Sequence, residues 1–308
     1  MKSRFRIAVV GSVHMDLIAH AERLPQAGES VNGLRFAMSP GGKGGNQAAQ
    51  CAALGTECFI ITQLGDDAFG RDLLGSLGQR GVDTRYVSVS TTHATGASTV
   101  FAVAGDYCSV ICSGAAAALQ PEAVGAALHK LAPLDAVLLQ LELPLALNMA
   151  AVAASNDALV VLNASPAPAH VPVALMHQVG LLIVNKTEAA RLLGVDEATL
   201  DVGVALHELA KLGPQKVVIT LGAEGAAGWD GAIEVWQKPF AIKVVDAVGA
   251  GDAFLSALVV QLIAGSSLQL AMRHGAAAGA IAASRSGAAL PPTAQEIADF
   301  LRKNEVSV

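Results

Sequence analysis

Charged residues are scarce in this sequence. They make up 15% of its 308 residues, and 26 acidic side chains against 20 basic ones give a formal net charge of −6. Sequence-independent binding to nucleic acid needs clustered lysine and arginine side chains. We therefore expect no nucleic-acid partner and favour a small-molecule ligand.

Cysteines and long apolar runs are also few. The four cysteines, Cys51, Cys58, Cys108 and Cys112, form no CxxC pair and have no histidine nearby at the spacing of zinc ligands. We expect them to be buried free thiols in a reducing compartment. The first apolar run, IAVVGSV, is short, and the apolar helical segment at 257–264 falls well below the roughly 20 residues that span a bilayer. The sequence therefore predicts a cytoplasmic protein with no signal peptide and no membrane segment.

Several catalytic motifs are missing as well. The chain contains no GxSxG, no HExxH and no Cys-His nucleophile signature, and GxGxxG does not follow the first predicted strand. The glycine-rich segment PGGKGGNQ (40–47) is not a Walker A loop, because Lys43 is followed by Gly44 and not by Ser or Thr. Hydrolase and dinucleotide-binding functions therefore lack their usual motifs.

Hydrophobic residues are abundant, at 53% of the chain, and 31 residues are glycine. This composition predicts a well-packed globular protein with many tight connections. Apolar strand-like segments alternate with helical ones, which predicts parallel βαβ units in an α/β fold: a doubly wound, mostly parallel central sheet flanked by helices. Such sheets bind ligands at the carboxyl ends of their strands. The main predicted strands are 7–10, 58–63, 86–89, 136–141, 159–162, 181–184 and 216–220.

Two segments do not follow this alternation. Residues 13–39 contain an alternating pattern, a turn and a second possible strand at 34–38, and residues 97–103 and 107–112 have the pattern of a hairpin. We expect the two segments to pair as a small β-sheet beside the main one.

The stretch VVDAVGAGDAFLSALVVQLI (244–263) has the strongest potential for chemistry. Its β-branched run predicts a strand that ends at Asp246, and Gly249 and Gly251 predict a turn before a long apolar helix that Asp252 opens. Glycines let the backbone approach a ligand, and a helix N-terminus favours an anion. A phosphate would fit this turn. Asp252 is also a good helix N-cap, and the two roles are compatible.

Polar residues follow other predicted strands. Lys43 and Asn46 can donate hydrogen bonds to a hydroxylated ligand, although Lys43 also fits an ordinary solvated loop. Asp16 and Glu142 lie where carboxylates can accept hydrogen bonds from a polyol.

Two strand-to-helix junctions leave alternatives open. Asn185 and Glu188 of NKTE form either a helix capping box or a face toward a hydrated Mg²⁺ ion. The segment TLGAEG (220–225) either bends around a nucleotide or turns into the next strand.

Together these motifs resemble the ribokinase-like (PfkB-type) family of carbohydrate and nucleoside kinases, and within it the ribokinases. Their order and spacing agree with the family over nearly the whole chain. The resemblance implies one kinase domain over residues 1–308, with residues 13–39 and 95–113 as an inserted lid through which a homodimer forms. The matching segments are GSVHMD (11–16), PGGKGGNQA (40–48), GDDAFG (65–70), LQLELP (139–144), NKTE (185–188), TLGAEG (220–225) and DAVGAGDAF (246–254).

The resemblance also implies an activity. The family transfers the γ-phosphoryl group of ATP to a hydroxyl of a sugar, here a primary hydroxyl, and D-ribose, which would give ribose 5-phosphate, is the first candidate. Asp252 would be the base, and the N–H groups of Gly249, Ala250 and Gly251 would form an anion hole, as phosphoryl transfer requires. Alternatives are a nucleoside, pentose or hexose kinase of the same family, a non-catalytic sensor of sugar or nucleotide, and, outside the family, a dinucleotide-dependent oxidoreductase.

Further residues match the family pattern. The sugar-binding positions correspond to His14, Asp16, Gly42, Lys43, Asn46, Glu142 and Asp252. The nucleotide-binding positions correspond to Asn185, Thr220, Gly222, Gly225, Gly251 and Ala276. Glu188 would help to organise Mg²⁺ through water. A K⁺ ion is a further candidate, at Asp246 and the carbonyl groups of Val248, Ala282 and Gly287.

Three positions depart from that pattern. His14 replaces the usual Asn of GSxNxD, which leaves the acceptor open: the imidazole either exchanges hydrogen bonds with a sugar hydroxyl or only fills the pocket. Ala247 replaces a common Thr beside Asp246, so K⁺ activation has less support than the chemistry. Ala276 stands where Asn or His often meets the adenine, which implies loose base selectivity.

Overall fold

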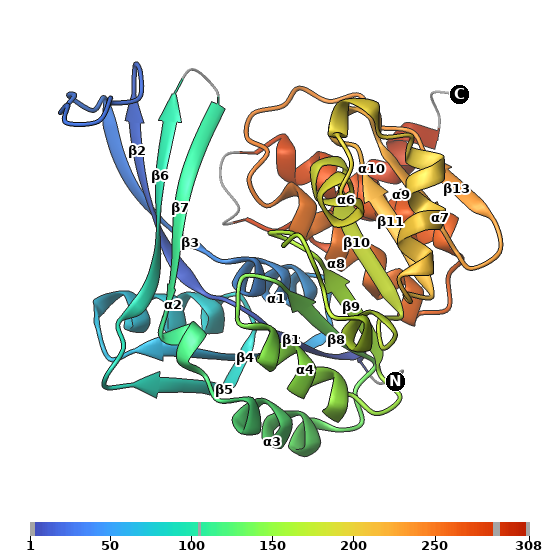
Figure 1. Cartoon of the computed structure of the whole chain (residues 1–308), viewed down its shortest axis with the longest axis horizontal. Coiled ribbons are helices and arrows are strands. Elements are labelled where there is room, and N and C mark those ends of the chain that lie inside the picture. The colour runs from blue at the N-terminus through green and yellow to red at the C-terminus, as the bar shows by residue number, and fades with distance from the viewer. Residues whose placement is uncertain (1–3, 104–105, 286–289, 306–308) are drawn as a thin grey trace.

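A nine-stranded sheet forms the framework of the protein (Figure 1). The computed structural model describes residues 4–103, 106–285 and 290–305. In spatial order the strands are β13 (Glu234–Gln237), β12 (Ala226–Trp229), β11 (Lys216–Thr220), β10 (Leu181–Asn185), β9 (Leu159–Asn163), β8 (Ala136–Gln140), β1 (Arg6–Val10), β4 (Glu57–Gly65) and β5 (Asp83–Ser90).

The sheet is parallel over most of its width. Every neighbouring pair from β11 to β5 is parallel, and only β12 and β13 join in antiparallel fashion. From β1 the chain first moves to β4 and β5, and it later returns to β8 on the other side of β1. The direction of winding therefore reverses between β1 and β8, which is where doubly wound sheets bind ligands.

Helices cover both faces of this sheet (Figure 1). Along β1, Ala8 and Val10 join the core under α3, α4 and α7, whereas Ile7 and Val9 join the core under α1, α2, α8 and α9. Side chains alternate in this way along any strand. The predicted fold class is thus confirmed. The helices are α1 (Lys43–Ala53), α2 (Ala68–Gln79), α3 (Pro121–Leu131), α4 (Leu145–Ala154), α5 (Val173–Met176), α6 (Lys186–Leu193), α7 (Val202–Lys211), α8 (Ala250–Ile263), α9 (Leu268–Ala283) and α10 (Ala294–Glu305).

A second sheet of four strands stands beside the first, at the left of Figure 1. Strands β6 and β7 form the predicted hairpin, and β6 pairs in parallel with β2, as expected for the two segments. In spatial order the strands are β3 (Arg35–Gly41), β2 (His14–Ala21), β6 (Thr95–Val103) and β7 (Asp106–Gly114).

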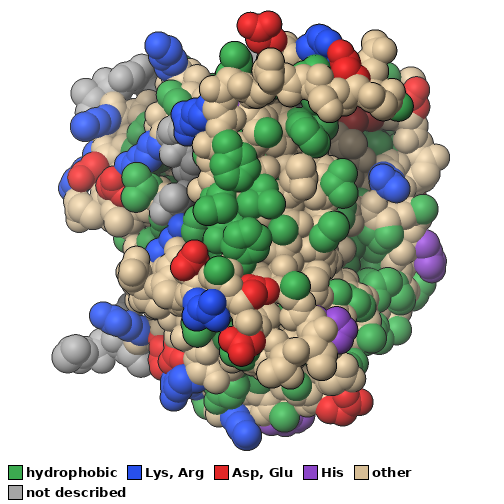
Figure 2. Space-filling model, turned by 90° about the vertical axis from the view of Figure 1, so that its left-hand side faces the viewer, with side chains coloured by type: hydrophobic (Ala, Val, Ile, Leu, Met, Phe, Trp, Pro, Cys, Tyr) green, Lys and Arg blue, Asp and Glu red, His purple; other side chains and the backbone are tan. Residues whose placement is uncertain are grey.

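The outer face of the small sheet is apolar. Phe36, Met38 and Val110 are exposed by 64%, 54% and 65%. The strand register places Met38 and Val110 in one row with Leu17, and Phe36 in the next row with Phe101. Figure 2 views the molecule from this side and shows hydrophobic side chains gathered near the middle of the face. We call Phe36, Met38, Phe101 and Val110 the lid outer face.

One predicted strand is wrong. Residues 241–249 are a loop, in which Val244 and Val245 are exposed by 61% and 58%. The amides of Val245 and Asp246 donate to the carbonyl of Ala283 at the end of α9, over 2.8 and 3.2 Å. Among the described residues, the β-branched run pairs with no strand, so its β propensity does not produce one.

The glycine-rich segment 40–47, in which Lys43 also fitted an ordinary solvated loop, is helical from Lys43 onward. Helix α1 already begins at Lys43, because Gly44 packs directly on the end of β1: a Cβ atom there would lie 2.6 Å from the carbonyl carbon of Gly11. This contact outweighs the low helix propensity of glycine. The helix α3 was not predicted either.

Two simpler expectations have clear outcomes. All four cysteines are free, but only Cys51 and Cys58 are buried, because Cys108 and Cys112 lie exposed on β7. Within the described part of the chain, no helix has both the length and the apolar character needed to cross a bilayer.

Candidate active site

A cleft of about 370 Å³ lies between the small sheet and the carboxyl ends of β8 to β11. Side chains from β2, β6 and β7 form one wall, and the starts of α1 and α8 contribute to the lining. It brings together most of the residues predicted from sequence. These are His14, Asp16, Gly42, Lys43, Asn46, Glu142, Asn185, Glu188, Thr220, Val248, Gly249, Gly251 and Asp252.

Glycines allow α1 to approach the end of β1. Gly42, with φ of 90°, precedes the helix, and a Cβ atom on it would lie 2.7 Å from the carbonyl oxygen of Ser12. Any other residue would be strained at this φ. The start of α1 is therefore held against the loop after β1, with Lys43 and Asn46 in the cleft.

Asp252 is not the helix cap that its position suggests. The N-cap of α8 is Gly249, in the left-handed conformation with φ of 77°, and Asp252 is the third residue of the helix. Its carboxylate is therefore free of a capping role and accepts two side-chain hydrogen bonds. Nε2 of Gln47 donates to Oδ1 over 2.9 Å, and Nδ2 of Asn46 lies 3.3 Å from Oδ2.

The surroundings of Asp252 shift its pKa. Burial raises the pKa above the ordinary value, and the negative charge of Glu142 acts in the same direction. The positive charge of Lys43 and the hydrogen bonds from Gln47 and Asn46 oppose this shift without cancelling it. A carboxylate with a raised pKa is a stronger base, which suits proton abstraction from a hydroxyl group.

The first turn of α8 offers backbone amides to an anion. Gly249 and Gly251 line the cleft, and the positive end of the helix dipole lies there. The amide of Ala250 donates to the carbonyl of Ala247 over 3.2 Å, so an anion would compete for this third amide.

Glu142 is held in place from two sides. Its Oε2 accepts hydrogen bonds from the hydroxyl of Ser12 and from the amide of Lys43, the latter over 3.0 Å. Its backbone carbonyl accepts from Ser113 Oγ over 3.0 Å. The carboxylate is thus fixed at the junction of β1, β8 and α1.

His14 and Asp16 form a pair on β2. Nε2 of His14 lies 3.2 Å from Oδ1 of Asp16, and His14 is only 3% exposed. In the neutral ring the Nε2–H group faces the carboxylate, which leaves Nδ1 as a buried acceptor without a partner among the described residues. The absence of a side chain at Gly41 makes room for Asp16, because a Cβ atom there would lie 2.2 Å from Oδ2.

The opposite wall contains the capping box. Oδ1 of Asn185 accepts from the amide of Glu188 over 2.7 Å, and Oε2 of Glu188 accepts from the amide of Asn185 over 2.8 Å. The capping box, one of the two alternatives for this segment, is therefore confirmed. Both side chains also line the cleft. No group of three or more His, Cys, Asp or Glu side chains in the described residues has the arrangement of a metal site. A Mg²⁺ ion that keeps its waters and binds phosphate oxygens would fit this wall, because it needs few protein ligands.

The other predicted nucleotide residues, Gly222, Gly225 and Ala276, do not line the cleft. Gly222 and Gly225 belong to the turn after β11, where their φ angles are 58° and 100°. A Cβ atom on Gly225 would lie 2.1 Å from the carbonyl oxygen of Gln237, so the turn itself requires glycine. Ala276 lies within α9 and packs against the core.

The predicted K⁺ residues are only partly brought together. Oδ1 of Asp246 accepts from the amide of Val248 over 2.9 Å, and Val248 lines the cleft. Ala282 lines a small hollow next to Gly249. Gly287 falls outside the described residues.

Three polar residues near the site were given no role from sequence. Gln47 and Gln140 are buried behind Asp252, and Asn163 lines the cleft at the end of β9. A polar residue that closes a buried apolar strand, as Gln140 and Asn163 both do, is the signal that could have identified two of them.

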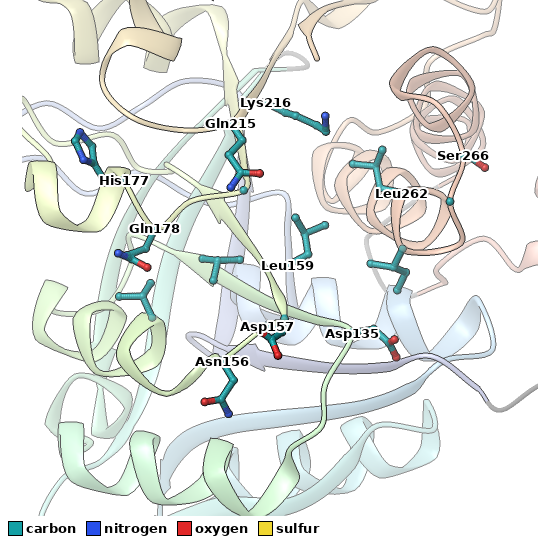
Figure 3. A pocket seen from close by; sticks show the side chains of 16 residues that line it. Asp135, Asn156, Asp157, Leu159, His177, Gln178, Gln215, Lys216, Leu262 and Ser266 are labelled. Carbon is teal, nitrogen blue, oxygen red and sulfur yellow. The ribbon is translucent and has the colours of Figure 1, made fainter. Parts of the chain in front are cut away.

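A larger hollow, of about 650 Å³, lies near the amino ends of the strands, on the side of the sheet away from the cleft. Figure 3 shows Asp135, Asp157 and Lys216 around it, near the amino ends of β8, β9 and β11. None of the predicted site residues lines it, and ligands of doubly wound sheets bind at the other ends of the strands. The smaller cleft is therefore the candidate active site.

The chain is similar to sugar kinases of known sequence and structure. The ribokinase of Bacillus subtilis is 33% identical over 96% of this chain and 99% of its own. The deoxyribokinase of Salmonella typhi is 29% identical over 97% of this chain and 99% of its own. A structure of Arabidopsis thaliana ribokinase complexed with ribose and ATP is 30% identical, with a TM-score of 0.87 over 97% of this chain and 99% of that one.

The family assignment covers almost the whole chain. The model of the family described as "pfkB family carbohydrate kinase" matches residues 4–295. This range includes all the strands of both sheets and every side chain that lines the cleft. The chain therefore belongs to the pfkB family of carbohydrate kinases.

Proposed function

We propose that this kinase transfers the γ-phosphoryl group of ATP to the primary hydroxyl of D-ribose, giving ribose 5-phosphate. The observation that carries the proposal is the Asp252 carboxylate, held by two amide donors at the amino end of α8 and open to the cleft. Relatives named ribokinase, and the structure of one with ribose and ATP, support the choice of acceptor.

In the proposed reaction Asp252 removes the proton of the attacking hydroxyl. The hydroxyl oxygen forms a bond to the γ-phosphorus while the bond from phosphorus to the bridging oxygen of ADP breaks, and Asp252 keeps the proton. The amides of Gly249 and Gly251, with that of Ala250 if it leaves Ala247, would stabilise the charge on the transferring group.

The acceptor would lie against the small sheet. Asp16, Asn46 and Glu142 offer oxygen and nitrogen atoms to its hydroxyl groups, and Lys43 and the backbone at Gly42 lie beside them. We infer that His14 contributes to selectivity through its bond to Asp16. The name of the deoxyribokinase relatives makes 2-deoxy-D-ribose a necessary member of any substrate panel.

The nucleotide would lie against β10 and β11. Asn185 and Thr220 line this part of the cleft, and the turn with Gly222 and Gly225 follows directly. Ala276 on α9 offers no side-chain hydrogen bond to the adenine, so we expect low selectivity for the base. When bound, Mg²⁺ would neutralise phosphate charge, and Glu188 would orient it through water.

A K⁺ site is a secondary proposal. The carbonyl groups of Val248, Ala282 and Gly287, together with Asp246, would hold the ion beside the first turn of α8. Asp246 already orders this loop through its bond to the Val248 amide, which supports a structural role for the site. With Ala247 in place of a hydroxyl residue, we expect a modest effect of K⁺ on turnover.

We further infer that residues 1–308 form one domain in which residues 13–39 and 95–113 are a lid. The lid outer face supports a homodimer, because a contiguous exposed apolar patch usually marks an interaction surface. The acceptor would then bind on the inner face of the lid while the outer face is covered by a second copy.

The experiment that tests the function is a coupled assay of ADP release. D-ribose, 2-deoxy-D-ribose, hexoses and nucleosides are compared as acceptors with Mg·ATP, with and without K⁺. We expect the highest kcat/KM with D-ribose. A preference for a nucleoside would identify the protein as a nucleoside kinase of the same family. Binding of sugar without any ADP release would identify a non-catalytic sensor.

A further inference from the structure

Buried amide side chains form a chain of hydrogen bonds that ends on Asp252. Nε2 of Gln140, the last residue of β8, donates to Oε1 of Gln47 on α1 over 2.7 Å. Nε2 of Gln47 in turn donates to Oδ1 of Asp252 over 2.9 Å and to Oδ1 of Asn163 over 3.2 Å. Gln47 and Gln140 are 0% and 1% exposed, so water does not compete for these bonds.

The ionised carboxylate fixes the direction of the whole chain, because it can only accept hydrogen bonds. Gln47 must turn its NH₂ group toward Asp252, so its carbonyl oxygen faces Gln140. Gln140 must then turn its own NH₂ group toward Gln47. Its remaining oxygen has no partner among the described residues and packs on Gly11, where a Cβ atom would lie 2.0 Å away. The oxygen that stays unpaired, at a cost in free energy, is therefore Oε1 of Gln140, whereas the Asp252 carboxylate keeps its hydrogen bond from Gln47.

We propose that Gln47 and Gln140 are positioning residues for phosphoryl transfer, which hold Asp252 in one orientation with Oδ1 occupied and Oδ2 available to the acceptor hydroxyl. The proposal rests on the proposed role of Asp252 as the base. Oδ2 makes the longer contact, 3.3 Å to Nδ2 of Asn46. It is therefore the oxygen that can more easily exchange its partner for the hydroxyl group of a substrate. Gln47 and Gln140 do not line the cleft, and they reach it through the shorter bond of Gln47 to Asp252 and its longer bond to Asn163.

The same chain affects the protonation of Asp252. Its bond from Gln47 lowers the pKa, whereas burial raises it. Loss of this bond therefore leaves the carboxylate protonated up to a higher pH. The titratable side chains that face Asp252 or its cleft are Lys43 on α1, Glu142 after β8, His14 and Asp16 on β2, and Glu188 on α6. All of them remain in the variants below, so a change in pH dependence reports the lost bond.

The test compares Gln47→Met, Gln140→Met, the double variant and Gln50→Met. Methionine keeps the length of the side chain and removes the amide. Gln50 is the matched control: it lies on α1, is 2% exposed, and donates over 2.7 Å to the carbonyl of Pro292 and not to a carboxylate. Urea unfolding and the pH dependence of kcat, with D-ribose and Mg·ATP, are measured for each.

We expect Gln47→Met to lower kcat by about tenfold to hundredfold, as for the loss of one hydrogen bond to a charged group. The acid limb of its pH profile moves to higher pH. Gln140→Met gives a smaller change of the same sign, and the double variant is no worse than Gln47→Met, because Gln140 acts through Gln47. Gln50→Met loses stability but keeps the wild-type pH profile.

A wild-type pH profile in both Gln47→Met and Gln140→Met would overturn the proposal, as would an equal shift in Gln50→Met. Asp252→Asn separates this failure from failure of the proposed function. If Asp252→Asn keeps its turnover, the base is wrongly assigned. If it is inactive while Gln47→Met and Gln140→Met both have the wild-type profile, only the positioning role is wrong. Should Gln47→Met not fold, Gln140→Met alone decides the question.

Discussion

In the proposed reaction, the pKa of Asp252 determines how turnover depends on pH. A general base works only when unprotonated, and burial raises the pKa of this carboxyl above its ordinary value. As pH falls through the raised pKa, Asp252 takes up a proton and kcat falls. We expect this decline to begin at a higher pH than an exposed aspartate would give, in a profile measured with D-ribose and Mg·ATP. A kcat that stays constant down to the ordinary range of aspartate would contradict the assignment.

His14 offers a test of acceptor selectivity. In His14→Asn, Asp16 loses the Nε2–H donor that now lies 3.2 Å away, so the hydrogen bonds that we propose between Asp16 and the sugar would change. We expect the ratio of kcat/KM between D-ribose and 2-deoxy-D-ribose to change by about tenfold, the effect of one hydrogen bond to a charged group. His20→Asn, on the same strand but outside the cleft, is the control. An unchanged ratio in His14→Asn would mean that the imidazole only fills space.

Single residues differ in how far sequence could identify them. Asn46 and Asp252 stand in recognisable motifs, and the cleft brings them together. Gln47 lies in the same motif as Asn46, but its role depends on partners 93 and 205 residues away in sequence, Gln140 and Asp252. Contacts over such separations arise only when β8, α1 and α8 pack, so no local pattern predicts them.

At the level of elements, the position of α1 depends on its contact with the end of β1. In Gly44→Ala the new Cβ atom would lie 2.6 Å from the backbone of Gly11, so the helix must move and take Lys43 and Asn46 with it. We expect a loss of about 1–3 kcal/mol in the free energy of unfolding, together with a lower kcat. Urea unfolding measures the first quantity, and the ADP-release assay measures the second.

Gly75→Ala on α2 is the matched control for this substitution. Nothing lies within 4 Å of its added Cβ atom. Alanine is the better helix former, so we expect the free energy of unfolding to rise by about 0.5–1 kcal/mol. If Gly44→Ala behaves like Gly75→Ala, then close contact between α1 and β1 is not what positions the cleft residues.

Elements were predictable where a local pattern agreed with tertiary packing. The buried strand β10 and the hairpin of β6 and β7 were predicted because continuous or alternating apolar residues match their environments. The prediction failed at 244–246, where the β-branched residues pair with no strand that the structure describes, and at 43–47, where glycines form a helix because another backbone lies against them. In both cases a distant segment decides the local conformation.

For the whole molecule, the lid outer face predicts a dimer. Phe36→Glu places a charge on the edge strand of this face, where Phe36 is 64% exposed in one copy of the chain. We expect the wild type to have twice the mass of one chain in light scattering after size-exclusion chromatography, and Phe36→Glu to have the mass of one. Ile233→Glu, at an equally exposed position of 60% in the turn between β12 and β13, should remain dimeric. A monomeric wild type would rule out this interface.

The Asp252→Asn variant tests the central claim most directly. We expect kcat with D-ribose and Mg·ATP to fall by about 10² to 10⁴-fold, because an amide cannot take the proton of the hydroxyl. Its affinity for ATP, measured by calorimetry, should stay close to that of the wild type. Asp157→Asn, in the larger hollow at the other edge of the sheet, should keep wild-type turnover. Near-normal turnover in Asp252→Asn would contradict the account of this site.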